Sequence, residues 1–139
     1  MIPRLTDNLD FHSQALSLRA ERQRLIAGNI ANADTPGFKA RDFDFASALR
    51  TASAARGANL GETGVGEGIA RGILTPGGQV TPTLRYALPS QTNLDSNTVD
   101  MDRERGAFMD NALKYDATLR FINGSVRTAL EAMKSHNQG

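Results

Sequence analysis

The last third of the chain repeats mostly apolar residues, with Arg105 as the charged exception, at a helical spacing that never slips, and this feature constrains the fold most. Between Met101 and Met133 the steps alternate between four and three residues, which is typical of a helix that packs a narrow stripe against another helix. At about 1.5 Å per residue such a helix is roughly 50 Å long, so it needs a partner of similar length from this chain or another copy. We call the stripe the C-terminal seam. It consists of Met101, Arg105, Phe108, Ala112, Tyr115, Leu119, Ile122, Val126, Ala129 and Met133.

A second stripe with the same spacing lies near the N-terminus. Its helix is expected over about residues 7–32, with Thr6 or Asp7 at the N-cap. Two positions of the stripe are polar. Arg22 and Asn29 either lie in the seam and set the register, or Arg22 extends to solvent while Asn29 caps the helix end. This N-terminal seam consists of Phe11, Ala15, Leu18, Arg22, Leu25 and Asn29.

The N-terminal helix is expected to end at Thr35-Pro36-Gly37. A residue before proline disfavours the helical region, and proline followed by glycine suits a type II turn in which glycine takes a positive φ. The apolar residues of Phe38–Phe45 switch faces, which indicates an irregular extended segment. Asp44 is expected to cap a short helix that follows.

The middle of the chain is rich in glycine, with eight glycines in the 22 residues from Gly57 to Gly78. Few large apolar residues accompany them, so this segment is expected to be a linker or insertion. Its Gly-Val-Gly-Glu-Gly run has no preceding strand and no P-loop lysine, so it gives little support to a nucleotide site. A short β hairpin is expected from residues 79–81 and 83–86.

These patterns predict a mainly α fold in which long N- and C-terminal helices pair as an elongated coiled coil. The irregular Gly-rich middle segment and the short hairpin complete it. Four segments are expected: residues 1–36 form the N-terminal helix of a core, and residues 37–56 an extended post-helix segment. Residues 57–95 form the Gly-rich flexible middle segment, and residues 96–139 the C-terminal coiled-coil helix.

Charge and composition exclude several classes of function. The 16 Lys and Arg residues nearly balance the 15 Asp and Glu residues, so a net charge of +1 gives no electrostatic case for nucleic acid or an anionic membrane. The absence of cysteine excludes disulfides and thiol catalysis. The N-terminus lacks the apolar core of a secretory signal, and no run approaches the roughly 20 apolar residues of a membrane span.

Candidate catalytic and metal-binding residues are few. The two histidines, His12 and His136, lie near opposite ends of the sequence and do not suggest a catalytic dyad or a metal site. Asp100, Asp102 and Glu104 could bind a divalent cation, but negative charge at the start of a helix also complements the helix dipole. The dipole interpretation is favoured. We therefore expect no catalytic, cofactor or metal site and no enzymatic activity.

Residues 26–39 resemble the N-terminal signature of flagellar rod and hook proteins, a helix ending in Asn-Ile-Ala-Asn followed by Thr-Pro-Gly-Phe and Lys. Residues 40–45 and 97–105 resemble the proximal-rod subclass of that family. Met109 stands where a smaller residue is expected, and Ser96 stands where glycine is expected. The matching positions are Asn29, Asn32, Thr35, Pro36, Gly37, Phe38, Lys39, Asp100, Met101, Asp102 and Glu104.

The resemblance implies a structural subunit of the proximal rod that polymerises through its terminal helices into the periplasm-crossing drive shaft and transmits torque. Implied partners are further copies, other proximal rod proteins, the rod-to-MS-ring linker protein, the MS ring and the flagellar export apparatus. No nucleic acid, small-molecule substrate or cofactor is implied, and export occurs without a cleaved signal peptide. Alternatives are another axial protein of the family or a non-flagellar coiled-coil secretion or adaptor protein. The Asn-Ile-Ala-Asn and Thr-Pro-Gly-Phe run favours the flagellar alternatives.

The two seams differ in length, and this difference predicts contacts between subunits. The N-terminal seam covers only part of the C-terminal seam, so neighbouring subunits are expected to cover the rest. Residues 38–45 are also expected to contact adjacent subunits. The residues expected to form the assembly seam are Phe11, Leu18, Leu25, Asn29, Phe108, Tyr115, Leu119, Ile122, Val126 and Met133.

Overall fold

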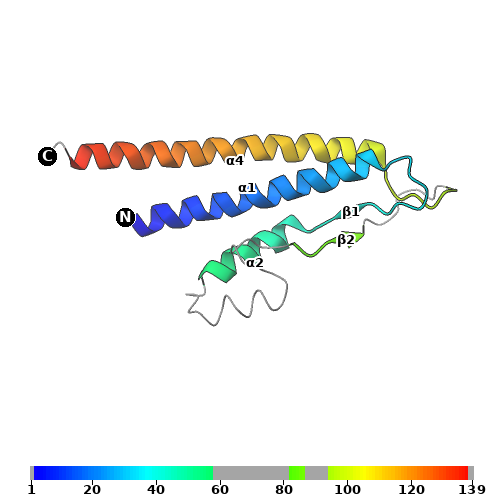
Figure 1. Cartoon of the computed structure of the whole chain (residues 1–139). Helices are drawn as coiled ribbons and strands as arrows, with labels where there is room; N and C mark the ends of the chain where they lie inside the picture. The colour runs from blue at the N-terminus through cyan, green and yellow to red at the C-terminus, as the bar shows by residue number, and fades with distance from the viewer. Residues whose placement is uncertain (1, 58–81, 87–93, 138–139) are drawn as a thin grey trace.

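The computed structural model describes residues 2–57, 82–86 and 94–137. Two long helices, α1 (Ile2–Ala31) and α4 (Met101–His136), lie side by side and run in opposite directions (Figure 1). Both chain ends therefore lie at one end of the pair. The prediction of a mainly α fold with packed terminal helices is confirmed. Most of the Gly-rich middle segment, including residues 79–81 of the expected hairpin, lies outside the described residues.

Helix α1 begins at Ile2, five residues before the predicted start. Pro3 falls in the first turn, where helical N–H groups lack an intrahelical acceptor and proline is tolerated. Thr6 and Asp7 therefore lie inside the helix, and the expected N-cap at these residues is wrong. Helix α1 therefore begins nine residues before Phe11, the first residue of the N-terminal seam.

The chain leaves α1 through the predicted turn. The Phe38 amide donates to the Thr35 carbonyl at 3.2 Å, and Gly37 has a φ of +73°. A side chain at Gly37 would be strained in this backbone region, so glycine suits the position. The turn interpretation of Pro36-Gly37 is confirmed.

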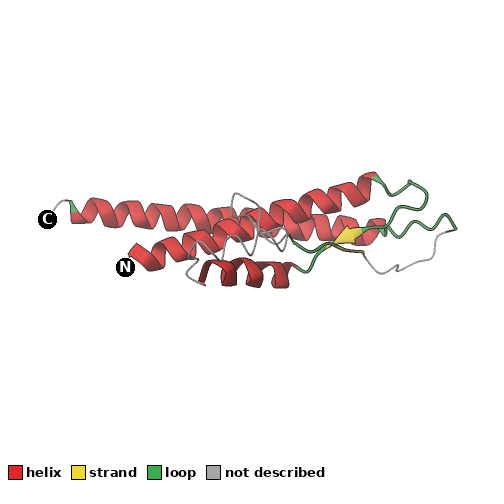
Figure 2. Ribbon diagram, turned by 60° about the horizontal axis from the view of Figure 1, so that its bottom comes forward, coloured by secondary structure: helices red, strands yellow, loops and turns green. Residues whose placement is uncertain are grey.

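The segment after the turn folds back along α1 through β1 (Arg41–Asp42) and α2 (Phe45–Gly57). Asp44 Oδ1 accepts hydrogen bonds from the amides of Ala46 at 3.1 Å and Ser47 at 3.3 Å, which confirms the predicted cap. Helix α1 lies between α2 and α4 in Figure 1, and the turned view of Figure 2 shows that α1 and α4 cross along their length.

The apolar core forms between α1 and this returning segment. It comprises Leu18, Leu25, Phe43 and Ala48, with Phe45 and Leu49 packed against it. Phe43 is 4% exposed and packs on its own chain, whereas Lys39, Arg41 and Asp44 of the same segment are exposed, so the expected contact of residues 38–45 with adjacent subunits stays a prediction. Burying an aromatic ring on the nearest apolar surface is favourable without any partner, because it removes apolar area from water.

A two-stranded antiparallel sheet forms between β1 and β2 (Arg85–Tyr86). Arg41 lies opposite Tyr86, and Asp42 lies opposite Arg85. The predicted partner of residues 83–86, residues 79–81, lies outside the described residues, and the described partner of residues 85–86 is β1. Pairing across this sequence distance leaves no local turn signal, so the contact with β1 was not predicted from the sequence.

The face of α4 that α1 covers differs from the predicted seam. The buried residues of α4 are polar and seven residues apart, namely Glu104, Asn111 and Thr118. Each precedes by one residue the seam members Arg105, Ala112 and Leu119, so the centre of the interface is rotated relative to the prediction. Glu104 and Asn111 hydrogen-bond to side chains and a carbonyl of α1, and Thr118 donates to the Lys114 carbonyl within α4. The two contacts with α1 account for this rotation, because an unpaired buried polar group is costly.

Candidate functional site: helix junction and assembly face

Asn97 joins the end of α1 to the start of α4. Its side-chain amide donates to the carbonyls of Asn32, Ala33 and Thr35 at 3.1, 2.8 and 2.8 Å. Its Oδ1 accepts from the Val99 amide at 2.8 Å, and the residue is 1% exposed. Carbonyls at a helix C-terminus have no intrahelical donors, so Asn97 supplies a cap from a distant part of the chain.

Backbone contacts reinforce this junction, which we define as residues 32–40 together with residues 95–100. Gly37 donates its amide to the Asp95 carbonyl at 2.8 Å, and the Thr98 amide donates to the Phe38 carbonyl at 3.1 Å. The Ala40 amide donates to Thr98 Oγ1 at 2.9 Å. The two termini of the connected helices are thus held by main-chain pairing as well as by side chains.

The family-motif residues lie in or beside this junction. The Asn32 side chain donates to the Gly28 carbonyl at 2.8 Å and accepts from Thr35 Oγ1 at 3.2 Å. Pro36 is exposed and Phe38 half-buried, and Lys39 is exposed beside β1. No local pattern in the sequence marks Asn97 as a link between the two helices. The signal that could have identified Asn97 is that it belongs to residues 97–105, the run that resembles the proximal-rod subclass.

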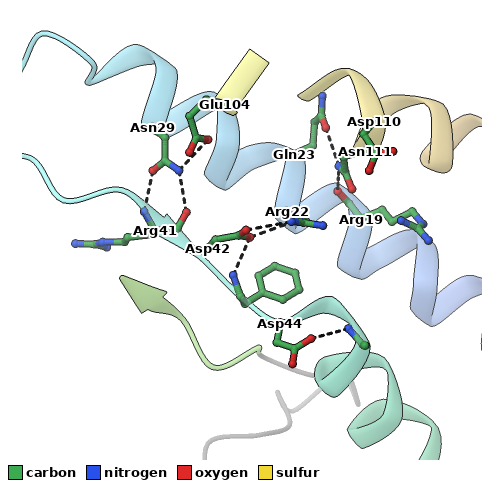
Figure 3. A network of polar contacts seen from close by, with 12 residues as sticks. Arg19, Arg22, Gln23, Asn29, Arg41, Asp42, Asp44, Glu104, Asp110 and Asn111 are labelled. Carbon is green, nitrogen blue, oxygen red and sulfur yellow. Dashed lines mark hydrogen bonds and ion pairs between the residues drawn. The ribbon is translucent and has the colours of Figure 1, made fainter. Parts of the chain in front are cut away.

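Asn29 connects three elements (Figure 3). Its Nδ2 donates to the Arg41 carbonyl at 2.8 Å and to Glu104 Oε2 at 3.2 Å, while its Oδ1 accepts from the Arg41 amide at 3.0 Å. Asn29 is 3% exposed, so the interpretation that it merely caps the helix end is wrong. The Asn29 side-chain amide thus satisfies both main-chain groups of Arg41 in β1, as a neighbouring strand would, and also donates a hydrogen bond to Glu104 in α4.

Burial raises the pKa of Glu104, and the hydrogen bond from Asn29 opposes this effect. Glu104 as a whole residue is 8% exposed. The structure therefore places a carboxyl group whose charged form is disfavoured where α1, β1 and α4 meet.

Arg22 also contacts the rest of the chain, which argues against the alternative in which it extends to solvent. Its Nε and Nη2 donate to the two carboxylate oxygens of Asp42 at 3.2 and 3.1 Å (Figure 3). Asp42 Oδ1 additionally accepts from the Phe43 amide at 2.8 Å. This forked pair fixes β1 against α1, with a geometry that lysine could not reproduce.

A third polar contact lies further along the helix pair. Asn111 Nδ2 donates to the Arg19 carbonyl at 2.9 Å and to Gln23 Oε1 at 2.7 Å. The Arg19 guanidinium lies over the Phe45 ring, 4.2 Å from its centroid. Such contacts require one orientation of α4 about its own axis relative to α1. Apolar packing alone specifies this orientation less selectively.

The rotation leaves apolar side chains of α4 exposed along one side. Phe108, Val126, Leu130 and Met133 are 36%, 40%, 52% and 63% exposed, and we call these four residues the apolar stripe. Val126 follows Phe108 by five helical turns, and the other two follow one and two turns later.

The seam residues divide between covered and exposed positions. Leu18 and Leu25 are buried on α1, whereas Phe11 is 45% exposed. Tyr115, Leu119 and Ile122 are half-buried on α4. Met109, where a smaller residue was expected, is 64% exposed and meets no steric obstacle there.

The acidic residues at the start of α4 have different surroundings and do not form one cluster. Asp100 is the N-cap and accepts from the amides of Asp102 and Arg103, Met101 begins the helix, and Glu104 turns toward α1. Within the described part of the chain, no three His, Cys, Asp or Glu side chains form a group that could hold a metal ion. None of the described helices is both long and apolar enough to span a membrane.

The histidines do not meet either. His12 stacks on Phe121 with ring centroids 5.7 Å apart and an interplanar angle of 15°. His136 follows Phe121 on α4 by fifteen residues, which corresponds to about 22 Å along a helix.

A family model described as flagella basal body rod protein matches residues 9–39, which span most of α1 and the turn after it. The chain is 42% identical to the flagellar basal body rod protein FlgB of Escherichia coli, over 99% of this chain and 100% of the relative. It is 43% identical to FlgB of Salmonella typhimurium with the same coverage. It is 42% identical to FlgB of Yersinia enterocolitica, over 96% of this chain and 98% of the relative. The chain therefore belongs to the family of flagellar basal body rod proteins of the FlgB type.

Proposed function

We propose that this chain is a structural subunit of the flagellar basal body rod, in its proximal part. Similarity to rod proteins over nearly the whole chain carries this proposal. The shape of the molecule agrees with it, because an elongated helix pair is suited to lengthwise packing of many copies.

The apolar stripe supports assembly through α4. Each fully buried Val, Leu or Met side chain contributes about 1.5–3 kcal/mol relative to its exposed state. The stripe would thus supply several kcal/mol per subunit when neighbouring subunits cover it, and polymerisation stabilises the helices by mass action. We place Phe11, Phe108, Val126 and Met133 at contacts between subunits. Tyr115, Leu119 and Ile122 serve contacts within and beside the pair.

The junction would transmit force between the two helices. Asn97 and Asn29 tie α1 to α4 and to β1 by hydrogen bonds between residues far apart in the sequence. A shaft that transmits torque requires subunits whose helices do not slide past one another. Polar contacts with defined geometry oppose such sliding better than apolar packing does.

The remaining assignments follow from the family. Residues 1–36 and 96–139 would form the rod core, with residues 37–56 packed on its side and residues 57–95 as an insertion. Partners would be further copies, other proximal rod proteins, the linker protein to the MS ring, the MS ring and the export apparatus. The role is structural and not catalytic, and export would occur without a cleaved signal peptide.

Deleting the gene and restoring it with a tagged copy tests the proposal. We expect the deletion strain to be non-motile, and the tagged chain to appear in purified basal bodies as density next to the MS ring. Density further along the axial structure would assign the chain to another axial component. Normal motility after deletion, or absence of the tagged chain from basal bodies, would refute the proposal.

A further inference from the structure

The sheet formed by β1 and β2 carries an exposed cationic surface. We define the cationic ribbon as Lys39, Arg41, Leu84, Arg85 and Tyr86. Lys39 Nζ and Arg41 Cζ lie 5.9 and 6.0 Å from the centroid of the Tyr86 ring, which is 66% exposed. All residues of the ribbon except Lys39 line a shallow cavity of about 190 Å³.

The cations of the ribbon have no carboxylate within ion-pair distance among the described residues. The nearest acidic residues in sequence are already engaged, because Asp42 pairs with Arg22 and Asp44 caps α2. Two cations gathered over one ring repel each other, and a negatively charged partner would relieve this repulsion.

The outer edge of β2 is open to another strand in the part of the chain that is described. Asn29 takes both the amide and the carbonyl of Arg41, so the main-chain groups of Arg41 point away from β2. Those of Asp42 then point toward Arg85, because hydrogen-bonding direction alternates along a strand. By the same alternation, the main-chain groups of Leu84 and Tyr86 point outward from β2.

We propose that an extended acidic segment of another protein adds to β2 as a third strand. Side chains on one face of a strand come from every second residue, so the segment would carry Asp or Glu at alternate positions on the Tyr86 face. Adjacent strands lie about 4.8 Å apart, and Lys39 and Arg41 already extend over β2, so a Glu side chain on the third strand is within their reach. The inference concerns the ribbon alone and does not depend on the rod assignment.

The acidic strand is assigned to a different protein and not to a second copy. The described extended run with alternating carboxylates is Asp42-Phe43-Asp44, and both carboxylates are held within the chain. Exchanging them between copies would break the Arg22 pair and the α2 cap.

Binding of a model peptide to the full chain tests the proposal. The probe is a fluorescent nine-residue peptide of alternating Thr and Glu, and binding is measured by anisotropy. Backbone amide shifts of Leu84 and Tyr86 are followed by NMR. We expect saturable binding, with shifts centred on β2. The double variant Lys39→Gln, Arg41→Gln should bind roughly five- to tenfold more weakly, since exposed ion pairs contribute modestly.

Controls separate strand addition from general charge attraction. The matched double variant Arg50→Gln, Arg120→Gln removes the same charge from exposed sites on α2 and α4 and should leave affinity unchanged. A peptide with Gln in place of Glu, or one methylated at alternate main-chain nitrogens along one edge, should lose binding. Equal weakening in both double variants would overturn the proposal. Undiminished binding of the methylated peptide, or self-association that Lys39→Gln and Arg41→Gln abolish, would also overturn it.

Discussion

Replacing Asn97 with alanine should destabilise the protein by about 2–4 kcal/mol, and the structure shows how this figure arises. Two of the three carbonyls that Asn97 caps keep a main-chain donor, since Thr35 donates to Asn32 and Phe38 donates to Thr35. The Ala33 carbonyl and the Val99 amide lose the partner that the described residues provide. Each unsatisfied buried group costs about 1–3 kcal/mol, and partial access of water to Ala33 lowers the total. Such a loss is a large fraction of a typical total of 5–15 kcal/mol.

Urea unfolding followed by circular dichroism measures this loss. All variants must be compared at one protein concentration, because association makes apparent stability concentration-dependent. Asn97→Asp should be worse than Asn97→Ala at neutral pH, because a carboxylate would face three carbonyl oxygens. Asn123→Ala, at an exposed position of α4, is the matched control and should stay within about 0.5 kcal/mol of the parent. An unchanged midpoint and slope for Asn97→Ala would refute the argument that this residue holds the junction.

Two further substitutions test individual positions. Glu104→Gln should stabilise the fold at pH 7, because burial raises the pKa of Glu104 and disfavours its charged form. Because the folded-state pKa is raised, the parent gains stability as pH falls. The difference in free energy of unfolding between the parent and Glu104→Gln should therefore shrink toward pH 4. A difference that does not change with pH would contradict the argument. Ser96→Gly should stabilise by about 0.5–1 kcal/mol, because Ser96 has a φ of +61°. Ser96→Ala keeps the strain and serves as the control, and equal stability of the two Ser96 variants would count against the argument.

Features encoded by neighbouring residues were predictable from the sequence. The four-three spacing predicted both long helices, Pro36-Gly37 predicted the turn, and Asp44 predicted the start of α2. Each depends on propensities and caps that act within a few residues. The start of α1 was predicted too late because Thr6 and Asp7 are typical N-cap residues, whereas the helix begins at Ile2 and accommodates Pro3 in its first turn.

Features that depend on contacts distant in sequence were not predictable. The polar line through Glu104 and Asn111 carries no hydrophobic signal, so the rotation of α4 could not be read from its pattern. The pairing of β1 with β2 and the role of Asn97 likewise join segments separated by more than forty residues. The expected glycine at position 96 was nevertheless informative, because Ser96 adopts the left-handed conformation that glycine favours.

The central claim is that neighbouring subunits cover the apolar stripe of α4, and one pair of substitutions tests it most directly. Leu130→Asp places a charge in the stripe at a residue that is 52% exposed, so the helix pair itself should still form. Thr128→Asp adds the same charge two residues earlier, on the opposite side of the helix and also exposed. The account predicts normal helicity for both purified proteins, with rods and motility in the Thr128→Asp strain and neither in the Leu130→Asp strain. Normal rods with Leu130→Asp, or an equal assembly defect with both substitutions, would contradict it.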